Sequence, residues 1–179
     1  MHNLNIQTFL FINGYAGKSI LIDKIFLFIT NPLIFIVLGL AALWIIIIRP
    51  LYKKDPVERL KTMRDALFFV TSMMLVWFVV SFIKSVVASP RPYQYFEGVK
   101  TLIIYGNFDS FPSLHAAFSF ALAFLVFKRH RSWGITLFAV ATLVGLSRVF
   151  VGAHFPIDVI VGVLLGVFIP WGLSSLIRR

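Results

Sequence analysis

Seven residues that are suited to phosphate chemistry lie in three short polar stretches between long apolar runs. In chain order they are Lys84, Arg91, Ser113, His115, Arg148, His154 and Asp158. Lysine and arginine supply the fixed positive charge and the N–H donors that a phosphate with several anionic oxygens requires. Histidine side chains act as nucleophiles, acids or bases near neutral pH. These residue types together indicate the transfer of a phosphoryl group.

The spacing of the histidines predicts a different role for each of them. Asp158 follows His154 by four residues, and Pro156 between them favours a helix start. The carboxylate can therefore accept a hydrogen bond from one ring nitrogen of His154 and leave the other nitrogen as the nucleophile. His115 is then available as the general acid that protonates the leaving oxygen.

A further anion site is expected where the third apolar run begins. Pro112 is suited to the first turn of a helix, where its missing N–H is not needed. The backbone N–H groups near Ser113 and Leu114 would then be free at a helix N-terminus, a position that binds phosphate. With the lysine and the two arginines, these groups form the expected phosphate site.

The elements that must position these residues are predicted to be membrane-spanning helices. Of the 179 residues, 59% are hydrophobic and only 13% are charged, whereas soluble domains have about 25% charged residues. The sequence contains no cysteine, which excludes a disulfide framework and a thiolate zinc site. No cleavable signal peptide is expected at the start of the sequence. The composition therefore predicts an integral membrane protein.

Five runs without Lys, Arg, Asp or Glu are expected to be transmembrane helices. They cover residues 25–48, 66–83, 112–127, 132–147 and 159–177. Pro32 is expected to kink the first run or to mark its true start, and Gly162 and Gly166 are spaced for close helix packing. The mixture of polar and apolar residues at 1–24 predicts an amphipathic helix in the membrane interface. A sixth membrane crossing by this segment is the alternative. We predict an all-α, polytopic helical bundle of five to six transmembrane helices, in one domain over residues 1–179.

Basic residues predict which side of the membrane each loop faces. Six Lys or Arg residues lie between the first two runs, three follow the third run and two end the sequence. The positive-inside rule places these segments in the cytoplasm and the three polar stretches on the outer side. Convergence of ionisable groups there is significant, because such groups are costly at membrane depth and usually functional. Anionic lipid headgroups and this orientation, not nucleic acid, explain the net charge of +10.

Three motifs in order resemble the type 2 phosphatidic acid phosphatase superfamily. The matching residues are Lys84 seven positions before Arg91-Pro92, then Pro112-Ser113-Leu114-His115, then Ser147-Arg148 followed by His154 and Asp158. The one departure is Leu114, where the family usually has glycine. A larger side chain there is expected to narrow the phosphate pocket or to restrain the backbone beside it.

The resemblance implies a metal-independent lipid phosphatase without a cofactor. It implies a phosphohistidine intermediate on His154, oriented by Asp158, with His115 acting as acid and then as base for water. The residues that it implies for phosphate binding are Lys84, Arg91, Ser113, Leu114 and Arg148. The size and loop spacing resemble bacterial undecaprenyl-diphosphate phosphatases of that superfamily. We therefore expect undecaprenyl diphosphate as the substrate, in a bacterial plasma membrane with the active site facing the periplasm or exterior; phosphatidylglycerophosphate, phosphatidate and lipid A 1-phosphate are alternatives.

Other interpretations of the same residues stay open. His115 and His154 could be metal ligands with Asp109 or Asp158, but three cations beside a metal would be repulsive. The arginines could anchor lipid headgroups, and a small lipid or anion transporter could use the basic cluster without a nucleophile. Haloperoxidases with bound vanadate share the constellation, but those relatives are soluble. An interfacial aromatic belt or a lid at the lipid entry would explain Tyr93, Tyr95, Phe96 and Tyr105.

Overall fold

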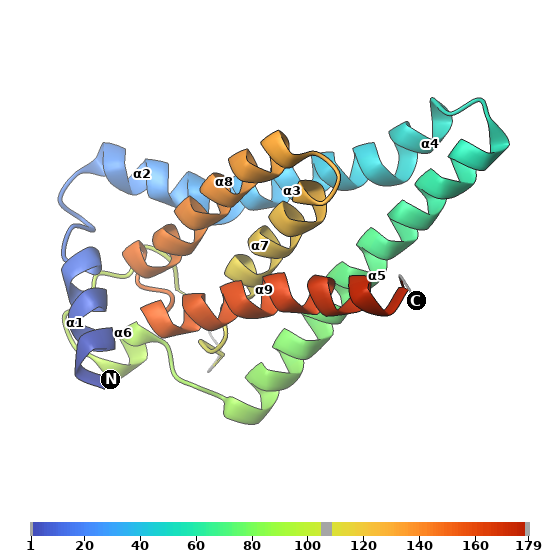
Figure 1. Ribbon diagram of the computed structural model, residues 1–179. Helices are drawn as coiled ribbons and strands as arrows, with labels where there is room; N and C mark the ends of the chain where they lie inside the picture. Colours follow the sequence, from blue (N-terminus) through green and yellow to red (C-terminus); the bar gives the residue numbers. More distant parts are fainter. Residues whose placement is uncertain (1, 105–108, 178–179) are drawn as a thin grey trace.

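Every regular element is helical in the part of the chain that the structure, a computed structural model, describes, residues 2–104 and 109–177. The elements are α1 (His2–Asn13), α2 (Ile20–Phe28), η1 (Ile29–Leu33), α3 (Ile34–Ala42), η2 (Leu43–Ile48), α4 (Arg49–Leu51), α5 (Pro56–Val87), α6 (Pro92–Tyr95), α7 (Leu114–Phe127), α8 (Arg131–Phe150) and α9 (Pro156–Ile177). Figure 1 shows their arrangement. Tyr105, Arg178 and Arg179, which entered the predictions above, lie outside the described residues.

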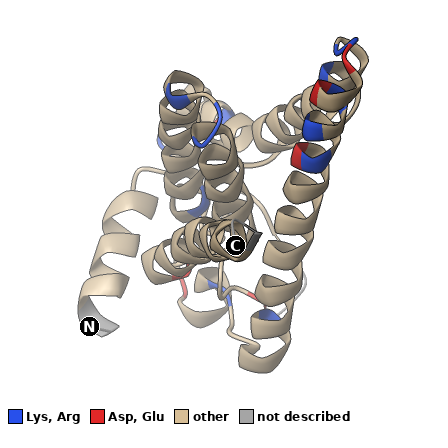
Figure 2. Ribbon diagram, turned by 45° about the vertical axis from the view of Figure 1, so that its right-hand side comes forward, with Lys and Arg blue, Asp and Glu red and all other residues tan. Residues whose placement is uncertain are grey.

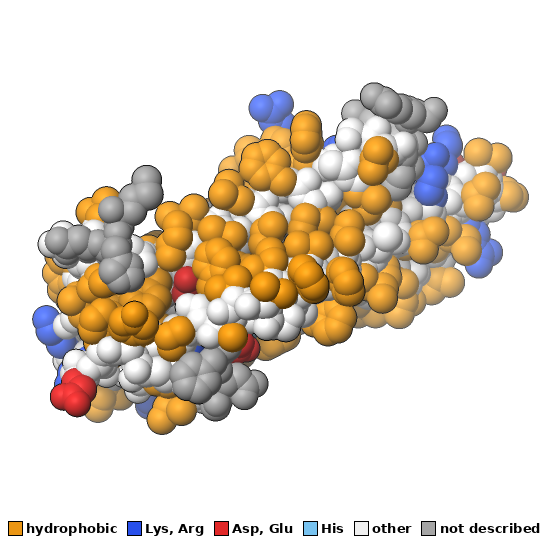
Figure 3. Space-filling view, turned by 90° about the horizontal axis from the view of Figure 1, so that it is seen from below, with side chains coloured by type: hydrophobic (Ala, Val, Ile, Leu, Met, Phe, Trp, Pro, Cys, Tyr) orange, Lys and Arg blue, Asp and Glu red, His pale blue; other side chains and the backbone are white. Residues whose placement is uncertain are grey.

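Within the described part of the chain, four helices are long and apolar enough to cross a membrane. They are Ile20–Leu51, Pro56–Tyr95, Arg131–Phe150 and Pro156–Leu176, and Leu114–Phe127 is a shorter apolar helix. Large hydrophobic side chains cover much of the outer surface of the bundle (Figure 3), as expected for helices in contact with lipid tails. The predicted fold class, an all-α polytopic membrane protein, is confirmed.

The first membrane helix is continuous from Ile20 to Leu51 and begins earlier than predicted. Asp23 lies in its first turn, where the carboxylate accepts a hydrogen bond from the backbone N–H of Gly17 at 3.1 Å. Pro32 lies inside the π-helical turn η1 and does not mark the start of the helix. Proline lacks an N–H and crowds the preceding turn, and a π-helical turn accommodates both defects.

The helix α5 carries Lys84 in its last turn and extends the predicted run 66–83 in both directions. The side chain of Asp55 accepts a hydrogen bond from the backbone N–H of Glu58 at 3.0 Å, and Pro56 occupies the first helical position. Both features favour a helix start. The helix ends at Ala88, whose backbone is left-handed with a φ of 44°. Lys84 is therefore held on a regular helix one turn before the chain changes direction.

The short helix α7 lies inside the bundle, in contact with α5, α8 and α9 (Figure 1). Its 14 residues rise about 21 Å, which is less than the roughly 30 Å of a bilayer core. Val76 and Val80 of α5 pack with Ala117 and Ala121 of α7 in a fully buried cluster. Because its neighbours cover it, α7 can be shorter than the helices that face lipid.

The glycines of α9 allow that helix to approach α7 closely, as their spacing predicted. A Cβ atom on Gly162 would overlap the carbonyl oxygen of Ser113, and one on Gly166 would overlap the backbone of Ala117. This contact fixes the start of α9 against the start of α7. Two of the predicted motifs lie at those two helix starts.

The helix α1 is not amphipathic, which corrects the prediction for residues 1–24. Phe9 is fully buried, whereas Phe11 is 69% exposed, so its apolar side chains are not confined to one face. Its polar side chains bind the protein: Asn13 donates hydrogen bonds to the carbonyl oxygens of Lys100 at 2.7 Å and Phe150 at 2.8 Å. At Asn13 the polar side chain therefore serves contacts with residues of a loop and of α8.

Most charged residues lie toward the two ends of the bundle (Figure 2). The connection between α4 and α5 and the turn between α7 and α8 lie at one end (Figure 1). The last turns of α5 and α8 and the first turns of α7 and α9 lie at the other end. The three polar stretches therefore meet, as predicted, and the side of the membrane that they face stays a prediction.

Candidate active site

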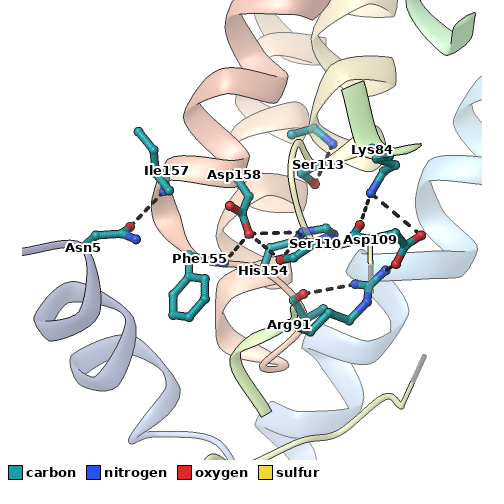
Figure 4. A network of polar contacts seen from close by, with 12 residues as sticks. Asn5, Lys84, Arg91, Asp109, Ser110, Ser113, His154, Phe155, Ile157 and Asp158 are labelled. Carbon is teal, nitrogen blue, oxygen red and sulfur yellow. Dashed lines mark hydrogen bonds and ion pairs between the residues drawn. The ribbon is translucent and has the colours of Figure 1, made fainter. Parts of the chain in front are cut away.

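Residues from separate helix ends and one loop come together at this end of the bundle (Figure 4). Lys84 lies in the last turn of α5, Arg91 precedes α6, Ser113 precedes α7, His154 lies in the loop 151–155, and Asp158 lies in the first turn of α9. The structure thus brings together, from distant parts of the sequence, residues that the sequence selected for phosphate chemistry.

Lys84 and Arg91 share Asp109 as a partner. Nη2 of Arg91 lies 2.5 Å from Oδ1 of Asp109, and Nζ of Lys84 lies 4.0 Å from Oδ2. Lys84 also donates a hydrogen bond to the backbone carbonyl of Asp109. Nη1 of Arg91 donates to the carbonyl oxygen of Ala153 at 3.1 Å, which fixes the guanidinium. The two cations therefore hold a carboxylate, and a phosphate group presents the same kind of anionic oxygen.

His154 and Asp158 lie side by side, as their spacing predicted, and a serine bridges them. Nδ1 of His154 is 3.6 Å from Oδ2 of Asp158, longer than an ordinary hydrogen bond. Oγ of Ser110 donates a hydrogen bond to that oxygen at 2.5 Å and lies 3.5 Å from Nδ1 of His154. The Ser110 hydroxyl and the Asp158 carboxylate therefore both lie near Nδ1 of His154, at almost equal distances. The Nε2 atom is the other ring nitrogen of this histidine.

Backbone groups hold Asp158 in place. Its Oδ2 accepts a hydrogen bond from the N–H of Phe155 at 2.8 Å, and its carbonyl accepts one from the N–H of Ser113 at 2.9 Å. The Ser113 N–H was expected to be free for phosphate, and this expectation is wrong here. The close approach of α9 to α7 at Gly162 brings the Asp158 carbonyl to that N–H. The Ser113 side chain faces the N–H of Ala116 at 3.5 Å and caps α7.

The environment of His154 favours its neutral form. The side chain is 2% exposed. Burial, followed by the nearby positive charges of Arg148, Arg91 and Lys84, lowers the pKa of His154 well below its usual range. A protonated imidazole cannot attack phosphorus, so a lowered pKa keeps this histidine in its nucleophilic form at neutral pH.

Arg148 is buried in the last turn of α8. The sequence had predicted that this helix ends before Arg148 and that Arg148 lies in the following loop. Its Nη1 donates a hydrogen bond to Oγ1 of Thr30 at 2.8 Å, and Oδ1 of Asn31 is 3.4 Å away. Its carbonyl oxygen accepts a hydrogen bond from the N–H of His154 at 3.2 Å. Arg148 therefore links the first membrane helix to the loop of His154. The sequence signal for this contact, a Thr-Asn pair before Pro32 within an apolar run, was missed.

His115 lies in the first turn of α7 and packs edge-on against Phe35, with ring centroids 5.9 Å apart. Its Nε2 atom is buried and has no hydrogen-bond partner among the described residues. Buried polar atoms are normally paired. The nitrogen is therefore placed to bind an oxygen atom of a ligand or of water.

Leu114, the residue that replaces the usual glycine, packs against the apolar cluster between α5 and α7. The pocket-narrowing effect expected of its side chain has no support in this packing. In the described part of the chain, no three His, Asp or Glu side chains lie close enough together to hold a metal ion. The metal-site interpretation of His115 and His154 therefore lacks a ligand set there.

Comparisons with known proteins place these residues in a family context. The family model of the PAP2 superfamily matches residues 65–179, which include every predicted site residue. The bacitracin transport permease protein BcrC of Bacillus licheniformis is 30% identical over 178 residues, covering 97% of this chain and 82% of the relative. The undecaprenyl-diphosphatase BcrC of Bacillus subtilis (strain 168) is 27% identical over 180 residues, covering 98% and 86%.

A solved structure has the same arrangement of helices. LpxE of Aquifex aeolicus superposes with a TM-score of 0.77 at 26% sequence identity, and the match covers 97% of this chain and 94% of that one. The similarity extends over both the membrane helices and the end of the bundle where the histidines lie.

Proposed function

Because the chain belongs to the PAP2 superfamily, and is therefore a metal-independent phosphatase of membrane lipid phosphates, we propose that it hydrolyses undecaprenyl diphosphate to undecaprenyl phosphate and inorganic phosphate. The substrate rests on near full-length similarity to the relative named undecaprenyl-diphosphatase in Bacillus subtilis. The roles of the residues rest on one observation: two cations hold an anionic group beside a buried histidine.

In the first step, the terminal phosphate of the lipid replaces the Asp109 carboxylate at Lys84 and Arg91. Nε2 of neutral His154 attacks the phosphorus atom, and the bond between phosphorus and the bridging oxygen breaks. His115 gives its proton to that oxygen, so undecaprenyl phosphate leaves. The Asp158 carboxylate, which lies beside the ring with Ser110, stabilises the positive charge that develops on the imidazole of His154.

In the second step, water attacks the phosphohistidine. His115, now neutral, takes a proton from the water molecule, and the water oxygen forms a bond to phosphorus. The bond between phosphorus and Nε2 of His154 breaks, which restores neutral imidazole and releases inorganic phosphate. Arg148 stabilises the additional negative charge in both steps from its fixed position on α8.

The membrane arrangement that fits this chemistry has five crossings, with α7 as the enclosed fifth helix. The basic segments at residues 49–64 and 128–131 face the cytoplasm, and the histidines face the exterior or periplasm. In this arrangement α1 lies at the outer interface and does not cross the membrane. Its Asn13 side chain donates hydrogen bonds to the carbonyl oxygens of Lys100 and Phe150, which lie at this end of the bundle.

A phosphate-release assay tests the proposed substrate. Purified protein in detergent is given undecaprenyl diphosphate, phosphatidylglycerophosphate, phosphatidate or lipid A 1-phosphate in the presence of EDTA. We expect the largest kcat/KM with undecaprenyl diphosphate. A larger value for another lipid would contradict the substrate, and no release from any of the four would contradict the phosphatase chemistry as well.

A transport function is the second candidate, because a relative over nearly the full length is named a bacitracin transport permease protein. Transport would need the basic cluster but no nucleophile. Proteoliposomes with externally added labelled lipid or bacitracin separate the two functions. Transport that persists in His154→Ala, without phosphate release by the unaltered protein, would favour the transporter.

A further inference from the structure

A groove of about 1310 Å³ lies at the end of the bundle opposite the histidines. We call it the basic groove, because one end of it is polar. That end is lined by Arg49, Arg64, Asp65, Lys128 and Arg129. Along α5, Asp65 is about 28 Å from Lys84. The groove is therefore separate from the phosphate site described above.

The polar end of the groove has an excess of positive charge. The Asp65 carboxylate is shared by two arginines: Nη1 of Arg49 lies 3.0 Å from Oδ2, and Nη2 of Arg129 contacts Oδ1. Arg64 and Lys128 add two more charges, and Nζ of Lys128 donates to Oγ of Ser174 at 2.8 Å. One carboxylate against four cations leaves the cluster strongly positive. In Figure 2 the ribbon positions of Lys and Arg at this end of the bundle lie on separate arms.

The walls of the groove are apolar and accessible. Leu40 and Trp44 of the first membrane helix, Leu67 of α5 and Trp133 of α8 line it. Their exposed fractions are 62%, 54%, 67% and 68%. Such side chains in a membrane protein contact acyl chains. Tryptophan in addition favours the level of the lipid headgroups.

We propose that the basic groove binds one anionic glycerophospholipid. The lipid phosphate lies among Arg64, Lys128 and the Arg49–Asp65–Arg129 cluster, and one acyl chain lies along the apolar walls. Arginine forks match phosphate oxygens, and basic pockets between membrane helices are typical sites for anionic headgroups. Arg49, Arg64 and Arg129 come from α4, α5 and the α7–α8 turn, so the bound lipid would bridge elements that diverge at this end of the bundle.

Native mass spectrometry of the whole protein in detergent tests this proposal, with phosphatidylglycerol as the anionic probe and phosphatidylcholine as the neutral one. The groove variant is Arg64→Gln/Lys128→Gln. The matched control is Lys53→Gln/Arg59→Gln, which removes the same charge from the same end of the bundle at residues that do not line the groove. We expect the groove variant to bind phosphatidylglycerol about tenfold more weakly and the control to bind it like the unaltered protein.

Equal weakening in the two double variants would overturn the proposal, because diffuse surface charge would then explain binding. So would equal binding of the two lipids by the unaltered protein. Lipid hydrolysis in the same preparations reports whether each variant is folded.

If the groove variant is inactive, the single variant Arg64→Glu replaces it. Arg64 is exposed and has no hydrogen bond or ion pair in the described part of the chain. Unchanged phosphatidylglycerol binding by active Arg64→Glu would also reject the site.

Discussion

Oγ of Ser110 lies 2.5 Å from Oδ2 of Asp158 and 3.5 Å from Nδ1 of His154. The serine hydroxyl donates to the carboxylate and can accept from the Nδ1–H of the histidine. In the proposed mechanism the imidazole proton is on Nδ1, which leaves the lone pair on Nε2 for phosphorus. We therefore propose that Ser110 positions His154 for attack.

Ser110→Ala should lower kcat by about tenfold to a hundredfold, the effect of losing a hydrogen bond to a charged group, with a smaller change in KM. Ser110→Thr keeps the hydroxyl and should recover part of the rate. Ser85→Ala is the matched control, because Ser85 is exposed and its hydroxyl binds the carbonyl of Phe82 in its own helix. If Ser110→Ala stays within twofold of the unaltered protein while remaining folded, the bridge has no role in catalysis.

Asp109→Asn should strengthen inhibition by inorganic phosphate. The carboxylate of Asp109 holds Arg91 and lies near Lys84, and phosphate has to replace it there. A neutral amide competes less for the two cations, so the inhibition constant for phosphate should fall. Inhibition curves at fixed pH measure the effect. Weaker inhibition in Asp109→Asn would show that the carboxylate orients the cations for phosphate instead of competing with it.

The acidic limb of the pH profile should depend on Arg148. Burial and the neighbouring cations, Arg148 foremost, lower the pKa of His154, so the nucleophile stays neutral below the usual histidine range. Removing the positive charge in Arg148→Gln raises that pKa, and the acidic limb of kcat should move to higher pH. Profiles of kcat against pH for the two proteins make the comparison. A limb that stays in place or moves to lower pH would contradict the assignment of this limb to His154.

Gly166→Ala should destabilise the bundle, because its new Cβ would overlap the backbone of Ala117. Overpacking of this kind costs about 1–3 kcal/mol. Gly172→Ala is the control, since a Cβ there meets no atom of the described residues within 4 Å. Thermal unfolding in detergent should give a lower Tm for Gly166→Ala only. Equal Tm values would mean that α7 and α9 can separate without loss of stability.

The convergence of the three motifs could be predicted from the sequence, because apolar run lengths and basic loops fix which helix ends meet. Lys84, Arg91, His154 and Asp158 lie where this reasoning placed them. The boundaries were less accurate. Arg148 belongs to α8 and not to a loop, since Val149 and Phe150 continue the helix as buried apolar residues.

The contacts made by Ser110 and Asp109 could not be predicted from local pattern, because serine and aspartate are ordinary residues in polar loops. For Thr30 the local sequence marks an unusual polar residue in an apolar run but does not give its partner. These contacts join residues far apart in the sequence: 48 positions separate Ser110 from Asp158, and 118 separate Thr30 from Arg148. Only the folded arrangement distinguishes those that support a histidine or an arginine from those that face water.

Covalent trapping tests the central claim, that His154 is the nucleophile, most directly. The protein is mixed with undecaprenyl diphosphate labelled in its terminal phosphate, quenched in base to preserve phosphohistidine, and digested for mass spectrometry. We predict label on His154, slower formation and slower loss of that label in His115→Asn because both proton transfers are removed, and neither label nor phosphate release in His154→Ala. Label on another residue, or turnover by His154→Ala near that of the unaltered protein, would contradict the account.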